Sequence, residues 1–346
     1  MKIKVFDFFS GCGGTSAGLK AAGFDIVFGL DIDNESAGTF TKNFSDAFFI
    51  NDDIRNVDVN IIKDMVDTYK ANSELVLFCG CAPCQPFSRQ NNQKKTDDPR
   101  LNLLWEFGRF VETCQPDFVL VENVPGIQKL DVSSGPLLSF IELIKSNKYH
   151  SNHGVIPAIW YGVPQKRERF VLLASKKSIV ELPEQTHDGE TTPYSTVRDW
   201  ISDLPPISAG ETHPQIMDHA APSLSALNIK RIKATPEGKG RESWPEELML
   251  ECHKNHNGHS DVYGRLAWDK PASGLTTRCI SYSNGRFGHP EQNRALSVRE
   301  AASLQTFPRD YLFHGSLSSK AKQIGNAVPP KMAEALGKAI LKSITK

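Results

Sequence analysis

The sequence predicts an α/β protein built on a doubly wound, mostly parallel sheet, with a second, smaller and irregular domain. Short apolar runs of four to six residues recur along the first 175 residues, and each is followed by a segment with helical periodicity. Continuous apolar runs are typical of parallel strands that are buried on both faces. After Ala174 this alternation stops, and prolines, glycines and histidines collect between residues 181 and 293.

The elements follow in order from this pattern. We expect strands at 4–9, 25–30, 75–78, 117–122 and 169–174, all of them parallel, and helices at 15–23, 35–44, 101–114 and 135–146. Regular structure returns at 294–308, where Ser297 and Glu300 have the spacing of a capping box at a helix start. The segment 329–344 predicts an amphipathic helix that begins with proline.

Composition favours a soluble protein of the cytoplasm. No apolar run approaches the roughly 18 residues of a membrane span, and the amino terminus enters a strand without a cleavage pattern. The seven cysteines indicate free thiols rather than disulfides. The formal net charge is 0, but residues 1–150 carry −5 and residues 151–346 carry +5. This asymmetry favours an anionic partner for the second half, although small imbalances also arise by chance.

A glycine-rich loop follows the first strand. In DFFSGCGG the backbone can approach a ligand closely at Ser10, Gly11, Gly13 and Gly14. Such a loop alone can be a simple tight turn. Asp31, however, lies 20 residues past Gly11, where an acid can bind ribose hydroxyls, and Asp53 follows a short third run and could accept from an adenine amine. The loop lacks a Walker lysine and is not GxGxxG, so a mononucleoside fits better than NAD.

Three cysteines lie together in CGCAPCQPFS at 79–88. They supply at most three ligands, where a structural zinc site needs four, and CHKNHNGH at 252–259 has no paired CxxC, so no metal is expected. Cys79 and Cys81 fit a buried strand end. Cys84 follows Pro83 at the carboxyl edge of the sheet among polar residues, which favours a reactive thiol over inert core. A polar stretch at 89–100 is suited to a lid, and Glu122 ends the next strand.

Six segments carry a resemblance to a known family. They are DFFSGCGG (7–14), PCQPFS (83–88), ENV (122–124), YGVPQKRERF (161–170), RALSVREAASLQTFP (294–308) and QIGNAVPP (323–330). In these segments, over about residues 1–175 and 286–346, the chain resembles the cytosine-5 DNA methyltransferases of bacterial restriction-modification systems. The resemblance implies a class I, Rossmann-like methyltransferase fold. It also implies a catalytic, cofactor-binding domain at 1–180 and 310–346, with a target-recognition domain and hinge at 181–309.

The resemblance also implies an activity. The enzyme would transfer a methyl group from S-adenosylmethionine to C5 of a flipped-out cytosine in duplex DNA, leaving S-adenosylhomocysteine. The Cys84 thiolate would add to C6, and Glu122, held protonated by partial burial, would contact N3. Arg167 and Arg169 lie two apart on a strand-like segment, so we expect them on one face, holding the base oxygen, the catalytic loop or a phosphate. Surface or structural roles are the alternatives for these charged residues.

Binding residues carry over by motif. The cofactor set is Phe9, Ser10, Gly11, Cys12, Gly13, Gly14, Asp31, Ile32, Asp53, Ile54, Pro83, Leu103, Asn326 and Ala327. Ile32 departs from the family, in which an aromatic side chain often stacks on adenine, and this departure would weaken cofactor binding. The DNA-binding set is Ser88, Arg89, Lys94, Lys95, Arg100, Lys230, Arg231 and Lys233.

The expected partner is double-stranded DNA, bound by a monomer of the prokaryotic cytoplasm associated with the nucleoid and not with a membrane. The sequence leaves open whether a cognate restriction endonuclease acts on the same site. Two other functions stay open at this point: a tRNA cytosine-5 methyltransferase, and a catalytically inactive DNA-binding regulator on the same fold. A zinc-dependent nucleic-acid module is a third, weaker alternative.

Overall fold

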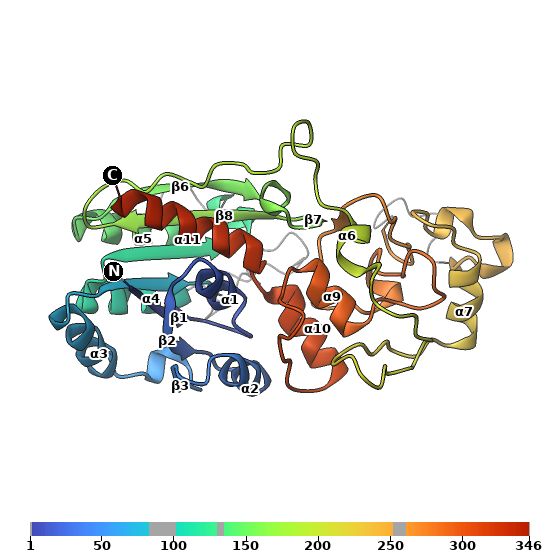
Figure 1. Cartoon of the computed structure of the whole chain (residues 1–346), viewed down its shortest axis with the longest axis horizontal. Coiled ribbons are helices and arrows are strands. Elements are labelled where there is room, and N and C mark those ends of the chain that lie inside the picture. The colour runs from blue at the N-terminus through green and yellow to red at the C-terminus, as the bar shows by residue number, and fades with distance from the viewer. Residues whose placement is uncertain (1, 83–101, 130–134, 252–260, 346) are drawn as a thin grey trace. The chain divides into compact units, whose positions relative to one another are not determined.

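The structure is a computed structural model, and it describes residues 2–82, 102–129, 135–251 and 261–345. The chain forms two compact units (Figure 1). Unit 1 comprises Met1–Ala158, Glu168–Gln185 and Val328–Lys346, and unit 2 comprises Ile159–Arg167 and Thr186–Ala327. The division differs from the expected domains, because residues 159–167 and 310–327 belong to unit 2 and residues 181–185 belong to unit 1.

Unit 1 is built on a seven-stranded sheet with the order β3-β2-β1-β4-β5-β8-β6. The strands are β1 (Ile3–Phe8), β2 (Asp25–Leu30), β3 (Phe48–Ile50), β4 (Leu75–Gly80), β5 (Phe118–Asn123), β6 (His150–Pro157) and β8 (Glu168–Ser175). β1 to β5 pair in parallel. This confirms the predicted doubly wound, mostly parallel fold, since the chain runs outward from β1 to one edge before crossing to β4.

One strand direction in this sheet was predicted wrongly, and the edge strand β6 was not predicted. The run at 169–174 forms β8, which is antiparallel to both β5 and β6. Its apolar sequence reflects burial on both faces, which an antiparallel strand inside a mixed sheet shares with a parallel one. β6 was not predicted because it lies at the edge of the sheet and its sequence, HSNHGVIP, is largely polar and partly exposed.

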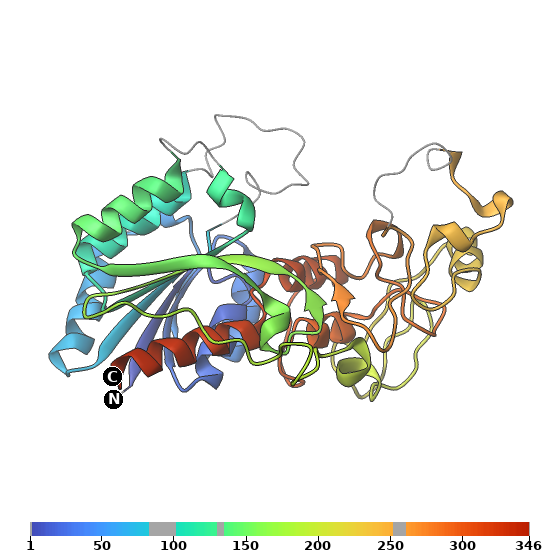
Figure 2. The ribbon, with the colours of Figure 1, turned by 90° about the horizontal axis from the view of Figure 1, so that it is seen from above.

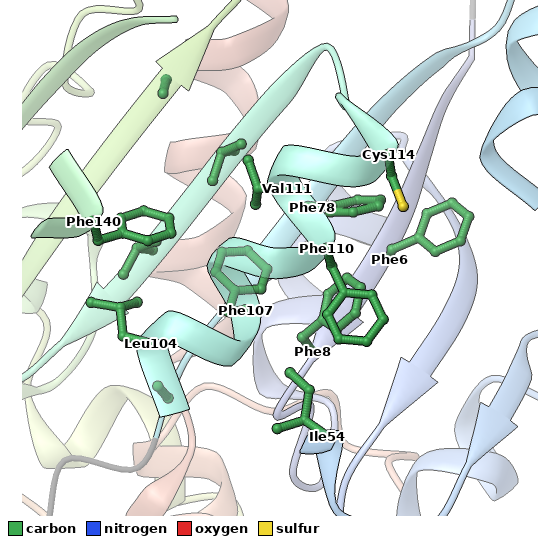
Figure 3. Packing of buried hydrophobic residues seen from close by; sticks show 14 of the residues in the cluster. Phe6, Phe8, Ile54, Phe78, Leu104, Phe107, Phe110, Val111, Cys114 and Phe140 are labelled. Carbon is green, nitrogen blue, oxygen red and sulfur yellow. The ribbon is translucent and has the colours of Figure 1, made fainter. Parts of the chain in front are cut away.

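Three helices pack on one face of this sheet: α3 (Val59–Ala71), α4 (Leu103–Cys114) and α5 (Pro136–Ser146). Phe6 and Phe8 of β1 and Phe78 of β4 meet Phe107 and Phe110 of α4 in the core (Figure 3). Ring centroids lie 5.0 Å apart for Phe8 and Phe78 and for Phe8 and Phe110. α3 was not predicted, although Asp58 caps its first turn and Ile62 and Val66 form its buried face.

The opposite face carries α1 (Gly14–Ala21) and α11 (Pro330–Ile344), and α2 (Asn34–Asn43) follows β2. Figure 2 shows α11 on the other side of the sheet from α5. α1 and α11 approach so closely that a Cβ on Gly18 would lie 2.2 Å from the Pro330 carbonyl oxygen. The carboxyl-terminal helix begins at Pro330, as predicted, and packs against the middle of α1.

Unit 2 has little regular structure, as its composition indicates. Its elements include β7 (Gln165–Lys166), α6 (Val197–Ile201), α7 (Ala226–Lys233), β9 (Ala272–Ser273), α9 (Val298–Leu304) and α10 (Leu317–Asn326). The predicted capping box is present at α9, where Ser297 Oγ accepts from the Glu300 amide and Glu300 accepts from the Ser297 amide. No helix in the described part of the chain is long and apolar enough to cross a membrane.

Candidate active site

The carboxyl ends of the central strands bring the predicted site of unit 1 together. Phe8, the last residue of β1, lies opposite Leu30 of β2 and Gly80 of β4. Just beyond the strands, the Ser10 amide donates to the Leu30 carbonyl at 2.9 Å, and the Cys81 amide lies 3.4 Å from the Phe8 carbonyl. The glycine loop and Cys81 therefore meet where the winding of the sheet reverses, the place where open α/β sheets bind ligands.

The glycine loop turns sharply before α1. Phe9, Gly11 and Gly13 have φ values of 57°, 52° and 84°. The Gly13 amide donates to the Ser10 carbonyl at 2.8 Å, which closes the turn. The left-handed conformation favours glycine at Gly11 and Gly13, because a Cβ atom makes it costly. Cys12 is buried, and burial raises the pKa of its thiol.

Asp31 ties this loop to the end of β2. Its Oδ2 accepts from the Gly11 amide at 2.8 Å, and its Oδ1 accepts from the Asp33 amide at 2.9 Å. Beside it the Ile32 side chain is 66% exposed, which is unusual for a large apolar residue. A carboxylate fixed by two backbone amides next to an exposed apolar side chain fits a nucleoside, because the acid can bind a ribose diol while the apolar group covers a base.

The predicted cofactor residues that follow β3, Asp53 and Ile54, are less open to a ligand than Asp31 and Ile32. Both carboxylate oxygens of Asp53 accept from the Arg55 side chain, at 2.9 and 2.5 Å, and this pairing lowers the pKa of Asp53. An adenine amine would therefore compete with Arg55 for this carboxylate. Ile54 is 3% exposed, and the Leu103 side chain at the start of α4 is also buried in the core. Ile54 and Leu103 are therefore part of the hydrophobic core of unit 1.

Glu122 and Arg169 form an ion pair across β5 and β8. The Arg169 Nε atom lies 2.6 Å from Glu122 Oε1, and Glu122 is buried. The sequence led us to expect that burial holds Glu122 protonated, but it did not reveal Arg169 as a partner. A guanidinium at this distance stabilises the ionised form of a carboxyl group. The next residue, Asn123, donates from Nδ2 to the Ala82 carbonyl at 3.1 Å. β5 thus holds Ala82, which precedes the predicted nucleophile Cys84 by two residues. Pro83 and Cys84 themselves lie outside the described residues.

Cys81 lies close to Thr15 of α1 and to Glu122 of β5. Its sulfur is 3.4 Å from the Thr15 Oγ1 atom, and burial, with the negative charge of Glu122, raises the pKa of its thiol. Cys79 is fully buried, and burial likewise raises the pKa of its thiol. This agrees with the prediction that Cys79 packs in a buried strand end. A reactive thiolate therefore does not fit Cys79 or Cys81 in this environment.

Asp7 is a buried acid that the sequence analysis did not single out. It lies on β1 under the loop with no exposed surface, and Ser16 Oγ donates to its Oδ2 at 2.6 Å. Its Oδ1 has no hydrogen-bond partner among the described residues. Burial raises the pKa of Asp7 to about 7, against the opposing effect of the Ser16 hydrogen bond. An acid inside an otherwise apolar run, VFDFF, was the signal that could have identified it.

Arg167 and Arg169 belong to different parts of the structure and have different partners. Arg167 lies between β7 and β8 and belongs to unit 2, whereas Arg169 belongs to β8 and unit 1. The Arg167 guanidinium is buried and donates to the Leu275, Gly325 and Ala327 carbonyls at 2.8, 2.9 and 3.2 Å. The prediction that both arginines lie on one strand is wrong, because β8 begins only at Glu168. Arg167 braces the segment that carries Asn326 and Ala327.

That segment is held closely on several sides. Asn326 ends α10 with an exposed side chain, and the Ala327 carbonyl also accepts from Gln305 Nε2 at 2.5 Å. A Cβ on Gly325 would lie 2.1 Å from the Thr276 carbonyl oxygen, so only glycine fits there. The backbone at 325–327 is therefore fixed by buried polar side chains of unit 2.

The predicted DNA-binding residues divide into two groups. Ser88, Arg89, Lys94, Lys95 and Arg100 lie outside the described residues, as does the 252–259 cluster. Lys230 and Lys233 are exposed on α7. Arg231 is 5% exposed, donates from Nε to the Leu248 carbonyl at 3.0 Å, and packs against Trp244 and Tyr263. A direct DNA contact does not fit this burial, and Arg231 stabilises the small core of unit 2 instead.

Comparison with known proteins places this geometry in a family. A model of the family described as C-5 cytosine-specific DNA methylase matches residues 3–342. The chain belongs to this family. It is 41% identical to the Type II methylase M.HgiDII of Herpetosiphon aurantiacus over 98% of this chain and 94% of that protein. It is 33% identical to the Type II methyltransferase M1.HphI of Haemophilus parahaemolyticus over 100% of this chain and 88% of that protein.

A solved structure of a prophage-encoded E. coli protein superposes with a TM-score of 0.77 at 24% identity, covering 100% of both chains, and shows the same fold. The family and the relatives confirm the predicted class of enzyme, a DNA (cytosine-5-)-methyltransferase of the restriction-modification type. They favour it over the tRNA methyltransferase and the inactive regulator.

Proposed function

We propose that this methyltransferase modifies cytosine C5 within a specific duplex sequence through a covalent adduct on Cys84. The observation that carries the proposal is the common edge of β1, β2, β4 and β5, which brings the glycine loop, Asp31, the entry to Cys84 and Glu122 together. A nucleoside site and a carboxylate lie on either side of the segment that leads to the nucleophile.

The residues of the site fit S-adenosylmethionine as the cofactor. The Asp31 carboxylate would bind the ribose hydroxyls, Ile32 would cover the adenine, and the loop at Phe9–Gly14 would leave room for the rest of the ligand. When bound, this cofactor supplies an electrophilic methyl group on a positively charged sulfur. Asn326, Ala327 and the remaining members of the predicted cofactor set keep this role as part of the proposal, with a smaller contribution from Asp53, whose carboxylate is paired with Arg55.

The chain's own groups would activate the cytosine. The Cys84 thiolate forms a bond to C6, and electron density moves to C5, which then accepts the methyl group. Loss of the C5 proton and breakage of the bond between sulfur and C6 restore the aromatic ring and release the thiolate. Glu122 would contact the N3 edge of the base, and Arg169 would hold the Glu122 side chain in place and face the base oxygen.

The target base must leave the duplex before it can reach this site. The polar segment at 88–100, with its lysines and arginines, would close around the flipped base and contact phosphates. Unit 2 would bind the recognition sequence. We further propose that the enzyme acts as a monomer in the prokaryotic cytoplasm and at its nucleoid, alongside an endonuclease that cuts the same site.

Trapping the adduct tests the proposal directly. Duplex DNA that contains 5-fluorocytosine should form a covalent complex with the wild-type protein in the presence of S-adenosylmethionine, because fluorine at C5 cannot leave as a proton does. Cys84→Ser should form no complex and should transfer no methyl group to unmodified duplex, while cofactor affinity measured by calorimetry stays within about twofold of wild type. Full activity of Cys84→Ser would refute the covalent mechanism.

A further inference from the structure

Unit 2 contains a pocket of about 590 Å³ that none of the roles described so far uses. The start of α7, the segment 277–283 and the exposed side of α10 form its walls, so that all of its lining belongs to one unit. We call it the Arg278 pocket, after the arginine that lines it together with Ser225, Asn228, Ile280, Ser281 and Lys322. Its size lies within the range of pockets that bind organic ligands.

The charge of this pocket is one-sided. Arg278 and Lys322 bring two cationic groups, and none of the described residues that line the pocket is an aspartate or a glutamate. Hydroxyl groups of Ser223, Ser225 and Ser281, among others, add hydrogen-bonding capacity, while Leu224, Ile280 and Leu317 supply apolar wall. A cationic surface that also carries hydroxyls and apolar side chains suits the edge of a base that is joined to an anionic backbone.

Arg278 differs from the other arginines of this unit. In the described part of unit 2, every other arginine has a partner: Arg167, Arg231, Arg265, Arg294 and Arg299 donate to carbonyls, Arg198, Arg286 and Arg309 pair with aspartates, and Arg241 is also engaged. Arg278 is exposed, and its guanidinium has no ion pair or hydrogen bond with any residue that the structure describes. Its five donors are therefore free for a ligand.

We propose that Arg278 is a specificity-determining residue, which reads a guanine of the recognition sequence from this pocket; the proposal rests on the proposed function. A planar guanidinium matches the O6 and N7 acceptors of guanine in the major groove, and this bidentate pair is the commonest specific contact between proteins and DNA. A guanidinium can also bind a phosphate in a bidentate way, but a phosphate contact requires no apolar side chains beside it. The apolar side chains that line the pocket with Arg278 favour a base edge instead, because they can contact a base and exclude water from it.

The test separates base reading from phosphate binding. Methylation of a random duplex library, read by bisulfite sequencing, defines the wild-type sequence. Methylation rates of wild type, Arg278→Ala and Arg278→Lys are then measured on that duplex and on duplexes with each base pair replaced in turn. For Arg278→Ala we expect a loss of about 5- to 150-fold on the cognate duplex and a collapse of discrimination at one G·C pair. Arg278→Lys should keep the charge and still lose that discrimination.

Arg198→Lys is the matched control, because Arg198 is an exposed arginine of the same unit that pairs with Asp269 outside the pocket. It should retain the wild-type sequence preference, and thermal unfolding should show all variants folded. An equal loss on every duplex, with a salt slope reduced by about 1, would make Arg278 a phosphate contact and overturn the proposal. Unchanged discrimination would also overturn it.

Failure of the proposed function would look different, because wild type would then methylate no duplex. Selection of bound duplexes from the same library, which does not depend on methyl transfer, measures the preference of each variant independently. A preference for guanine at one position that is lost in both Arg278 variants supports the proposal in that assay. Retention of the same preference by Arg278→Ala contradicts it.

Discussion

The Arg169 guanidinium and the Glu122 carboxylate form an ion pair at 2.6 Å, in which the side chains expose only 14% and 9% of their surface. The two residues lie on adjacent antiparallel strands, with Glu122 opposite Val171 in the register of β5 and β8. The pair sets the charge at the edge of the sheet where the cytosine would bind. Because both side chains are largely withdrawn from water, removal of one charge would leave the other buried without a partner.

Removal of Arg169 should therefore impair both stability and catalysis. Arg169→Ala leaves a buried carboxylate without its partner, and we expect a loss of about 3 kcal/mol in the free energy of unfolding and a fall in kcat of about 100-fold or more. Chemical denaturation and steady-state kinetics on duplex DNA measure the two effects. In the double variant Arg169→Ala/Glu122→Gln the stability loss should be smaller than the sum of the single losses. Additive losses would show that the pair is not coupled.

Asp31 should control cofactor affinity through the glycine loop. Asp31→Ala removes the acceptor for the Gly11 and Asp33 amides and for the ribose, so we expect binding of S-adenosylhomocysteine to weaken by about 10- to 100-fold in calorimetry. Asp53→Ala is a matched control, since the Asp53 carboxylate is already occupied by Arg55, and its effect should be much smaller. Equal effects of the two variants would contradict the assignment of the ribose to Asp31.

Arg167 should act as a positioning residue. Arg167→Met keeps much of the side-chain volume but leaves the Leu275, Gly325 and Ala327 carbonyls without their buried donor, which we expect to lower the free energy of unfolding by about 3 kcal/mol. Because Asn326 lies in this segment, the KM for S-adenosylmethionine should rise more than kcat falls. A large fall in kcat with an unchanged KM would instead place Arg167 at the cytosine.

Asp7 should make stability depend on pH. Its pKa of about 7 in the folded state lies above the ordinary value of 3.8, so the folded protein binds more protons than the unfolded chain between these values. Stability therefore falls as pH rises through this window, by an amount on the order of 4 kcal/mol at most. Asp7→Asn removes the titration and keeps an acceptor for Ser16.

Thermal unfolding of wild type and Asp7→Asn between pH 4 and 8 checks this expectation. At pH 8 the variant should be more stable than wild type. Near pH 5, where wild-type Asp7 is protonated, the two proteins should have similar free energies of unfolding. A wild-type curve that rises from pH 5 to pH 8 with a slope unaffected by the substitution would show that other groups dominate.

Local pattern in the sequence was enough for most of unit 1. The apolar runs of β1, β2, β4, β5 and β8 identify strands because each is buried on both faces, and Ser297 and Glu300 identify a helix start because capping involves residues three apart. The same approach missed β6, whose polar sequence reflects an edge position. It also gave β8 the wrong direction, since burial does not depend on the direction of a strand.

The sequence by itself determined the fold class, the glycine loop with Asp31, and the motifs that place the chain among cytosine-5 methyltransferases. Only the tertiary structure decided how the charged side chains are used. It separated Arg167 from Arg169, paired Arg169 with Glu122, buried Arg231 and left Arg278 open in a pocket. The reason is physical: a helix or strand follows from neighbouring residues, whereas the partner of a charge comes from residues distant in the chain that folding brings together.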